Sequence, residues 1–127
     1  MSTVDVHIDS EMTDMIVFVF HAYWNFADFR SAMLESRQLM PIDKVRAFII
    51  DMREPESSTL PPNAISGVRA AFKDINDTKM TYLVGATGFV KNMVQVFETI
   101  MPRFRSMFRN VRTMEEARLL AAELAVH

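Results

Sequence analysis

The chain has 127 residues, half of them apolar, and this length and composition suit one domain with its own hydrophobic core. A net charge of −2 and an isoelectric point near 5.9 give no basic excess, so we expect neither nucleic acid nor anionic lipid as a partner. Cysteine is absent, which excludes disulfides, thiol nucleophiles and zinc–thiolate sites.

The sequence shows no targeting or membrane-spanning pattern. Its first residues are acidic and polar, whereas a secretory signal begins with basic residues and continues with apolar ones. The longest strongly apolar run covers only residues 15–20, far short of the roughly 20 residues that a spanning helix needs. We therefore expect a cytoplasmic protein without membrane insertion.

Two strand-like runs open the chain. The first alternates apolar Val4, Val6 and Ile8 with polar neighbours, which is typical of a half-exposed edge strand. The second run, residues 15–20, is apolar at every position, as in a strand that is covered on both faces. The polar turn between them is too short for a crossover, so the pattern predicts an antiparallel hairpin.

Helices and strands then alternate. Asn25 is a candidate N-cap for a helix over residues 26–39, and a buried strand is predicted over residues 45–52. Apolar spacing predicts a second helix over residues 65–75, and the run MTYLV predicts the next strand. A GATG turn then leads into a third helix, over residues 89–101.

The C-terminal part adds a short strand and a last helix. The run RSMFRNV predicts the strand, and Thr113 with Glu116 forms a capping box at the start of the helix. The order is therefore ββαβαβα(β)α. It predicts a single α/β layered domain over residues 1–127, with a mixed, mostly parallel sheet of four or five strands and an N-terminal antiparallel hairpin.

Four features accompany this order: FIID at the end of the third strand, a hydroxyl-bearing loop before the second helix, the stretch YLVGATGFV, and FRNVRTMEEARLL near the end. With them, the chain resembles the STAS domain of sulfate transporters and anti-sigma factor antagonists. The resemblance is in topology and pattern over nearly the whole chain, and it is closest to the stand-alone, SpoIIAA-like bacterial members. It implies a non-enzymatic regulatory module that binds a protein partner, such as a kinase-like anti-sigma factor. Phosphorylation of a Ser or Thr before the second helix would switch that binding.

The loop after the third strand carries the corresponding hydroxyls. Family members have an Asp-Ser-Ser-Gly-Leu-like stretch, and here residues 56–60 read Glu-Ser-Ser-Thr-Leu. A phosphate group at a helix N-terminus is stabilised by the free N–H groups and the helix dipole, which would suit a phosphorylation switch. The alternative is that the hydroxyls only cap the helix and form the turn, since these roles need the same residue types. The candidate residues for phosphorylation or partner contact are Ser57, Ser58, Thr59 and Asp51. Asp51 also suggests a receiver-domain phosphoacceptor, but the acidic pair and the lysine of such domains are missing.

Three further groups are candidates for an interface or a ligand. Gly85, Thr87 and Gly88 belong to a strand-to-helix turn that could hold a small anion or simply require glycine dihedrals. Arg103 and Arg105 lie in a basic stretch with interleaved aromatic residues. This pattern could contact an acidic protein, a phosphate or, less readily, nucleic acid, and it also occurs in an ordinary alternating strand. The connection after the second strand carries Tyr23 and Trp24, residue types that anchor protein interfaces, although a lid over the core would need the same types.

The leading functional hypothesis is a regulatory protein-binding module that acts through the sheet end near the loop of residues 57–59. The alternative is a binder of a small apolar or anionic ligand, in a pocket near Trp24 and the GATG turn. An enzyme comes third, because the sequence shows no catalytic constellation, and the three histidines lack metal-binding spacing. We expect neither a metal nor another cofactor. Homodimerisation stays open, since an exposed edge strand invites pairing.

Overall fold

The computed structural model of the chain describes residues 2–55, 66–67, 79–86, 91, 94–95, 97–99, 101–104 and 106–124, without the side chain of residue 103. The predicted helix over residues 65–75 lies mostly outside this part, and only residues 66–67 of it are described, as helical. The predicted helix over residues 89–101 is described in part, with residues 91, 94–95 and 97–99 helical. The elements are, in chain order, β1 (Val4–Ile8), β2 (Met15–Phe20), α1 (Phe26–Leu39), the 3₁₀ helix η1 (Ile42–Lys44), β3 (Ala47–Asp51), β4 (Thr81–Val84), the 3₁₀ helix η2 (Pro102–Phe104), β5 (Phe108–Val111) and α4 (Met114–Ala122).

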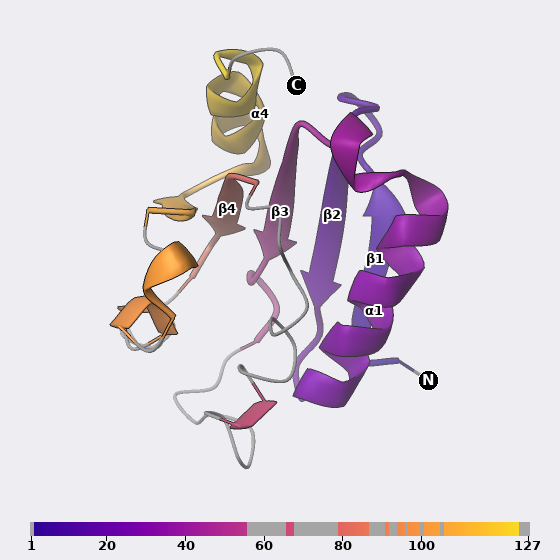
Figure 1. Cartoon of the computed structure of the whole chain (residues 1–127), viewed down its shortest axis with the longest axis vertical. Helices are drawn as coiled ribbons and strands as arrows, with labels where there is room; N and C mark the ends of the chain where they lie inside the picture. Colours follow the sequence, from indigo (N-terminus) through magenta and orange to yellow (C-terminus); the bar gives the residue numbers. More distant parts are fainter. Residues whose placement is uncertain are drawn as a thin grey trace.

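The strands form one mixed sheet in the order β1-β2-β3-β4-β5. β1 pairs antiparallel with β2, and the remaining neighbours pair in parallel, with Val17 beside Ile49 and Ile49 beside Tyr82. Both the mixed sheet and the N-terminal hairpin confirm the prediction. Because β2, β3, β4 and β5 run parallel to one another, their C-terminal ends lie on the same side of the sheet, and the arrowheads of β2, β3 and β4 point down in Figure 1.

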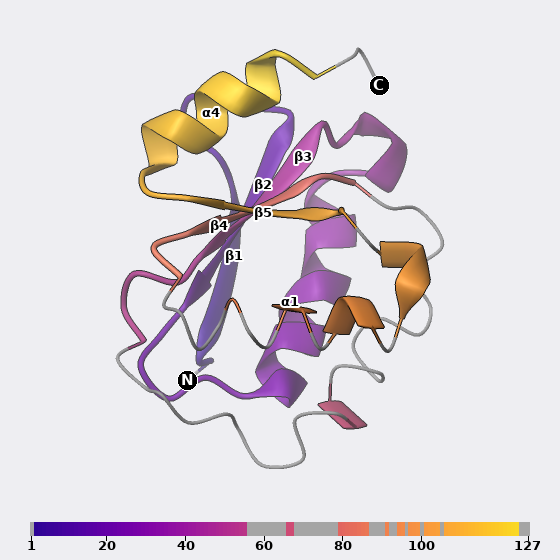
Figure 2. The same cartoon turned by 90° about the vertical axis from the view of Figure 1, so that its left-hand side faces the viewer.

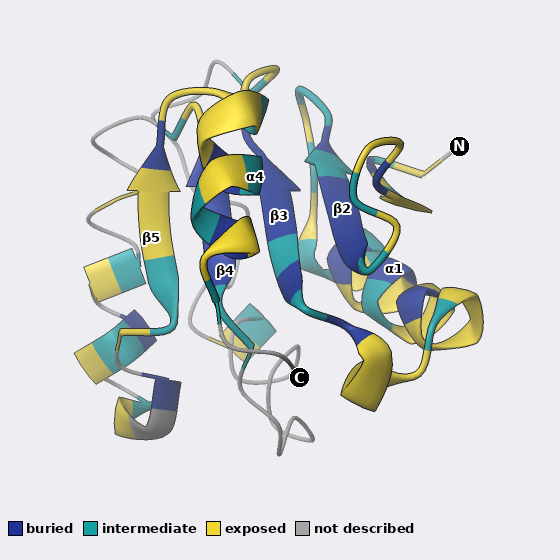
Figure 3. Cartoon of the chain, turned by 90° about the horizontal axis from the view of Figure 1, so that it is seen from above, coloured by how far each residue is buried: buried dark blue, intermediate teal, exposed yellow. Residues whose placement is uncertain are grey.

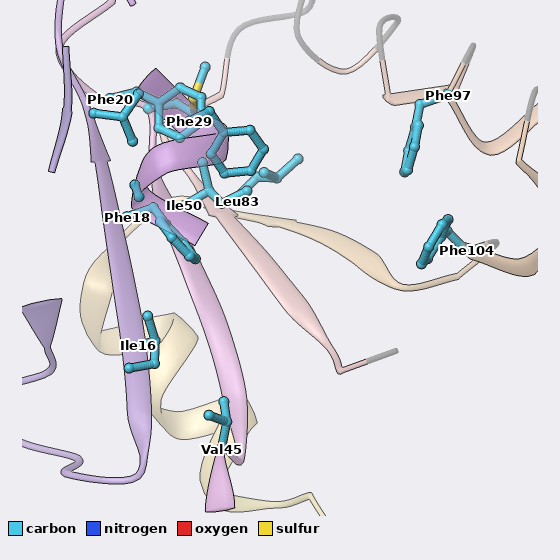
Figure 4. Packing of buried hydrophobic residues seen from close by; sticks show 12 residues of the cluster. Ile16, Phe18, Phe20, Phe29, Val45, Ile50, Leu83, Phe97 and Phe104 are labelled. Atoms are coloured by element: carbon cyan, nitrogen blue, oxygen red, sulfur yellow. The ribbon is translucent and has the colours of Figure 1, made fainter. Parts of the chain in front are cut away.

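Two layers cover the sheet, with α1 on one face and α4 on the other (Figure 2). On the α1 face, Phe18 and Phe20 of β2 pack against Phe29 in one apolar cluster (Figure 4). On the α4 face, a second cluster joins the sheet to Ala117 and Ala121. Burial by both layers explains why β2 is apolar throughout and why β2 and β3 are mostly buried in Figure 3.

The third strand begins later than the sequence indicates. The predicted strand covers residues 45–52, but β3 starts at Ala47. The N–H of Val45 donates a hydrogen bond to the carbonyl of Ile42, at 3.1 Å, and thereby closes the η1 turn. Val45 is still buried, so its apolar character reflects the core and not a strand.

Both predicted helix caps are present. The Asn25 side chain accepts a hydrogen bond from the N–H of Asp28 at 2.8 Å, and the Thr113 hydroxyl accepts one from Glu116 at 3.0 Å. In return, Glu116 accepts a hydrogen bond from the N–H of Arg112, one residue earlier than a standard capping box places it. Within the described residues, no helix is long and apolar enough to cross a membrane.

The hairpin turn between β1 and β2 is tied to the rest of the chain by ion pairs with Arg118 and Arg46. Arg118 of α4 binds the buried carboxylate of Asp9 through Nε and Nη2, at 3.0 and 2.9 Å. Arg46 binds Asp14 at 2.8 Å and also donates to the carbonyl of Leu124. These contacts fix the end of the sheet opposite to the carboxyl ends of β2 and β3.

Candidate functional site

The edge at which β2, β3 and β4 end carries most of the described candidate residues. Ligand and partner sites of open α/β sheets commonly lie at the carboxyl ends of parallel strands. Residues 21–25 follow β2, residues 52–55 follow β3, and residues 85–86 follow β4. Asp5, near the start of the antiparallel β1, reaches the same edge through its contact with His21. We call this set of residues, together with Asp51, the C-terminal edge (Figure 1).

The two aromatic residues after β2 have different environments. Tyr23 is 91% exposed, whereas Trp24 is half-buried. The Trp24 ring packs against Phe20 at 4.7 Å and against Phe26 at 4.9 Å between ring centroids. Trp24 therefore closes the end of the core on the α1 face, and Tyr23 presents its ring to solvent.

A histidine between two carboxylates joins three segments of this edge. Nε2 of His21 lies 2.6 Å from Asp5 of β1, and Nδ1 lies 2.5 Å from Glu54, which follows β3. The hydrogen bond to Asp5, and then the one to Glu54, raises the pKa of His21 above the ordinary value of 6.5. All three side chains remain partly exposed.

Asp51, at the end of β3, is held in a two-pronged ion pair with Arg53. Its Oδ1 accepts from Nε at 2.9 Å and its Oδ2 from Nη2 at 2.7 Å, and the backbone N–H of Arg53 adds a bond of 3.1 Å. Burial alone would raise the pKa of Asp51, but the hydrogen bonds from Arg53 outweigh it and lower the pKa. Asp51 thus fixes the direction in which the chain leaves β3.

Gly85 makes a turn that only glycine fits well. Its φ angle is +74°, and a Cβ atom there would lie 2.7 Å from Cγ of Arg53. The N–H of Gly85 donates to the carbonyl of Val111 at 3.2 Å, so it is already used inside the protein. Of the two alternatives for this turn, the positive φ angle of Gly85 agrees with the one in which glycine is needed for its backbone conformation. Thr87 and Gly88 lie outside the described residues.

Several other predicted site residues cannot be placed. Ser57, Ser58, Thr59 and Arg105 lie outside the described residues, and Arg103 is described only as backbone, within η2. Within the described part of the chain, no group of His, Asp and Glu side chains could hold a metal ion. The C-terminal edge therefore brings together Asp51, Tyr23, Trp24 and Gly85 from the predicted set.

The contact between His21, Asp5 and Glu54 was not predicted from the sequence, although the pairing of His21 with Asp5 could have been. In the hairpin of the structure, Asp5 lies opposite Val19, and His21 follows Val19 by two residues, just past the end of β2. That register already indicates a diagonal pair between Asp5 and His21. No sequence pattern indicates the contact of Glu54 with His21, because the position of Glu54 depends on the pairing of β3 with β2 and on the turn that follows β3.

In comparisons with known proteins, no family model matches the chain and no curated protein matches it significantly.

Proposed function

We propose that the chain is a non-enzymatic regulatory module that binds a protein partner through its C-terminal edge. The observation that carries the proposal is the 91% exposure of Tyr23. A tyrosine ring supplies a large contact area for little loss of side-chain freedom, which makes it a frequent anchor of protein interfaces. The resemblance of the sequence to STAS domains of the anti-sigma factor antagonist type supports the same function.

The surroundings of Tyr23 suit a preformed binding surface. The segment after β3 is held by the Asp51–Arg53 pair and by the contact of Glu54 with His21. The N–H of Met52 also donates to the carbonyl of Val84 at 2.9 Å, which extends the β3–β4 pairing by one residue. A surface whose backbone is fixed before binding loses little entropy when the partner docks.

The exposure of Tyr23 favours a protein interface over the alternative, a pocket for a small ligand. Such pockets bury most of their ligand among covered apolar side chains. Tyr23 is 91% exposed to solvent, and the Trp24 ring is already packed against Phe20 and Phe26.

Replacing Tyr23 by alanine should lower the affinity for the protein partner of the wild-type chain by about 30-fold or more. This corresponds to a loss of about 2 kcal/mol of binding free energy at an interface anchor. The measurement is a titration of the purified partner by calorimetry. Leu119 on α4 gives a matched control, because it is also an exposed apolar side chain, at 69%. Leu119→Ala should keep the wild-type affinity, and equal affinities of all three chains would exclude Tyr23 as an anchor.

Phosphorylation in the loop of residues 57–59 is the second part of the proposal. It rests on the resemblance to STAS domains and on the three hydroxyls, Ser57, Ser58 and Thr59. Added negative charge beside Glu54 and Glu56 would repel the existing carboxylates and alter the surface. A variant with all three residues changed to Asp should lose affinity for the partner, whereas the triple Ala variant should keep it. The same affinity for both variants would show that the loop is a connector.

A further inference from the structure

The contact between His21, Asp5 and Glu54, which we call the His21 clamp, spans three segments that are far apart in sequence. Asp5 belongs to β1, His21 follows β2 directly, and Glu54 follows β3. A histidine can donate a hydrogen bond from both ring nitrogens only when it is protonated, since the neutral ring carries one N–H. The two short contacts, 2.6 Å to Asp5 and 2.5 Å to Glu54, therefore fit an imidazolium between two carboxylates.

The clamp holds the chain close to the loop of residues 57–59. Between Asp51 and Glu54, the segment is attached to the sheet by the Arg53 ion pair and by the backbone bond of Met52. Glu54, the residue before Pro55, then contacts His21, which directly follows β2. If His21 loses its proton, one of the two carboxylates faces a ring nitrogen lone pair, and its hydrogen bond is lost.

We propose that the His21 clamp is a proton-operated switch that fixes the segment after β3 when His21 is protonated and releases Glu54 when it is not. This inference concerns the regulation of the C-terminal edge, and its biological role rests on the proposed function. The release would free Glu54 and Pro55 from their attachment to His21 and change the surface beside Tyr23. The partner should then bind more weakly at alkaline pH.

The direction of the pH dependence follows from the raised pKa of His21. A raised pKa in the folded state means that the clamp stabilises the chain fully below about 6.5, the ordinary value for histidine. This stabilisation is lost as the pH rises through the pKa of the folded state. Acidification below neutrality therefore keeps the clamp closed, and alkaline conditions open it.

Other charged groups around His21 do not produce the same pH response. Asp51 and Arg53 neutralise each other, and carboxylates and guanidinium groups keep their charges near neutral pH. From α1, Asp28 accepts hydrogen bonds from Thr3, whose carbonyl accepts the backbone N–H of His21. Among the described residues, His7 is a second histidine, two residues from Asp5 on the same face of β1, and its signals have to be distinguished from those of His21 by assignment.

The test is a titration of the purified chain by nuclear magnetic resonance, following the imidazole of His21 and the backbone amide of Glu54. We expect His21 to titrate above 6.5 and the Glu54 amide to change with the same midpoint. In Asp5→Asn and in Glu54→Gln, the His21 midpoint should fall towards 6.5, and the amide change should disappear in His21→Gln. His7→Gln is the matched control and should leave both curves unchanged. A His21 midpoint at or below 6.5, or a Glu54 curve that persists in His21→Gln, would refute the clamp.

The titration needs no partner, so it separates the clamp from the proposed function. If His21 titrates as expected but Tyr23→Ala does not change the affinity for the partner, the proposed binding surface is refuted and the clamp is supported. If neither Asp5→Asn nor Glu54→Gln shifts the titration midpoint of His21, but Tyr23→Ala weakens partner binding, the clamp is refuted and the binding surface is supported.

Discussion

Replacing Arg118 by alanine is expected to lower the free energy of unfolding by about 3 kcal/mol, because it leaves a buried carboxylate without its partner. Asp9 is only 2% exposed, and both of its oxygens accept hydrogen bonds from Arg118, at 2.9 and 3.0 Å. The N–H of Met12 contributes a further bond to Asp9 at 2.9 Å, which the variant keeps. Arg118 also pairs with Glu11, so the loss affects the whole turn between β1 and β2.

Urea denaturation at neutral pH measures the effect, with Arg30→Ala as control. Arg30 is an exposed arginine on α1, and its removal should change stability by less than about 0.5 kcal/mol. Equal stabilities of the two variants would contradict the structural role of the Asp9–Arg118 pair.

The same pair predicts how stability responds to acid. The hydrogen bond from Arg118 is the largest influence on Asp9 and lowers its pKa below the ordinary value of 3.8. The stabilisation from this lowered pKa is fully present above 3.8 and is lost as the pH falls through the pKa of the folded state. Below that range, the stabilities of wild type and Arg118→Ala should therefore converge.

The second large effect is expected for Phe18→Ala, which should cost about 4 kcal/mol by opening a cavity beneath α1. Phe18 is 4% exposed, and its ring meets Phe29 edge-on, with 5.6 Å between the ring centroids (Figure 4). The ring centroid of Phe48 lies 5.8 Å away. These contacts join α1 to β2 and β3, so the loss should loosen the packing of the helix.

Val19 provides the comparison for Phe18. It is the next residue on β2, it points to the opposite face, and it is only partly buried. Val19→Ala should cost about 1 kcal/mol, because it removes two methyl groups from a half-covered position. Both variants are compared by thermal and urea unfolding. A smaller effect for Phe18→Ala than for Val19→Ala would contradict the arrangement of α1 on the sheet.

Local signals explain which elements could be predicted. β2 begins and ends where the apolar run does, because an uninterrupted apolar stretch between polar residues is sufficient for a strand covered on both faces. α1 begins after Asn25 as predicted, because the cap is a contact within four residues. The start of β3 was predicted two residues too early, since Val45 is apolar for burial and its backbone belongs to a turn.

The site was harder to predict because its contacts join distant residues. Tyr23 and Trp24 are adjacent in sequence, and only the packing of Trp24 on Phe20 and Phe26 separates the exposed ring from the half-buried one. The bond between His21 and Glu54 joins residues 33 positions apart, and it needs the neighbouring positions of β2 and β3. No composition or periodicity signal encodes such a contact.

The central claim is that a protein partner docks at the C-terminal edge, and site-specific photocrosslinking in the native host tests it most directly. A photoreactive phenylalanine analogue placed at position 23 should crosslink one protein reproducibly, and the same analogue at position 119 on α4 should not. A crosslink to that same protein from position 119 but not from position 23 would contradict the claim. The absence of any crosslink at position 23 would contradict it as well, provided that the substituted chain remains folded.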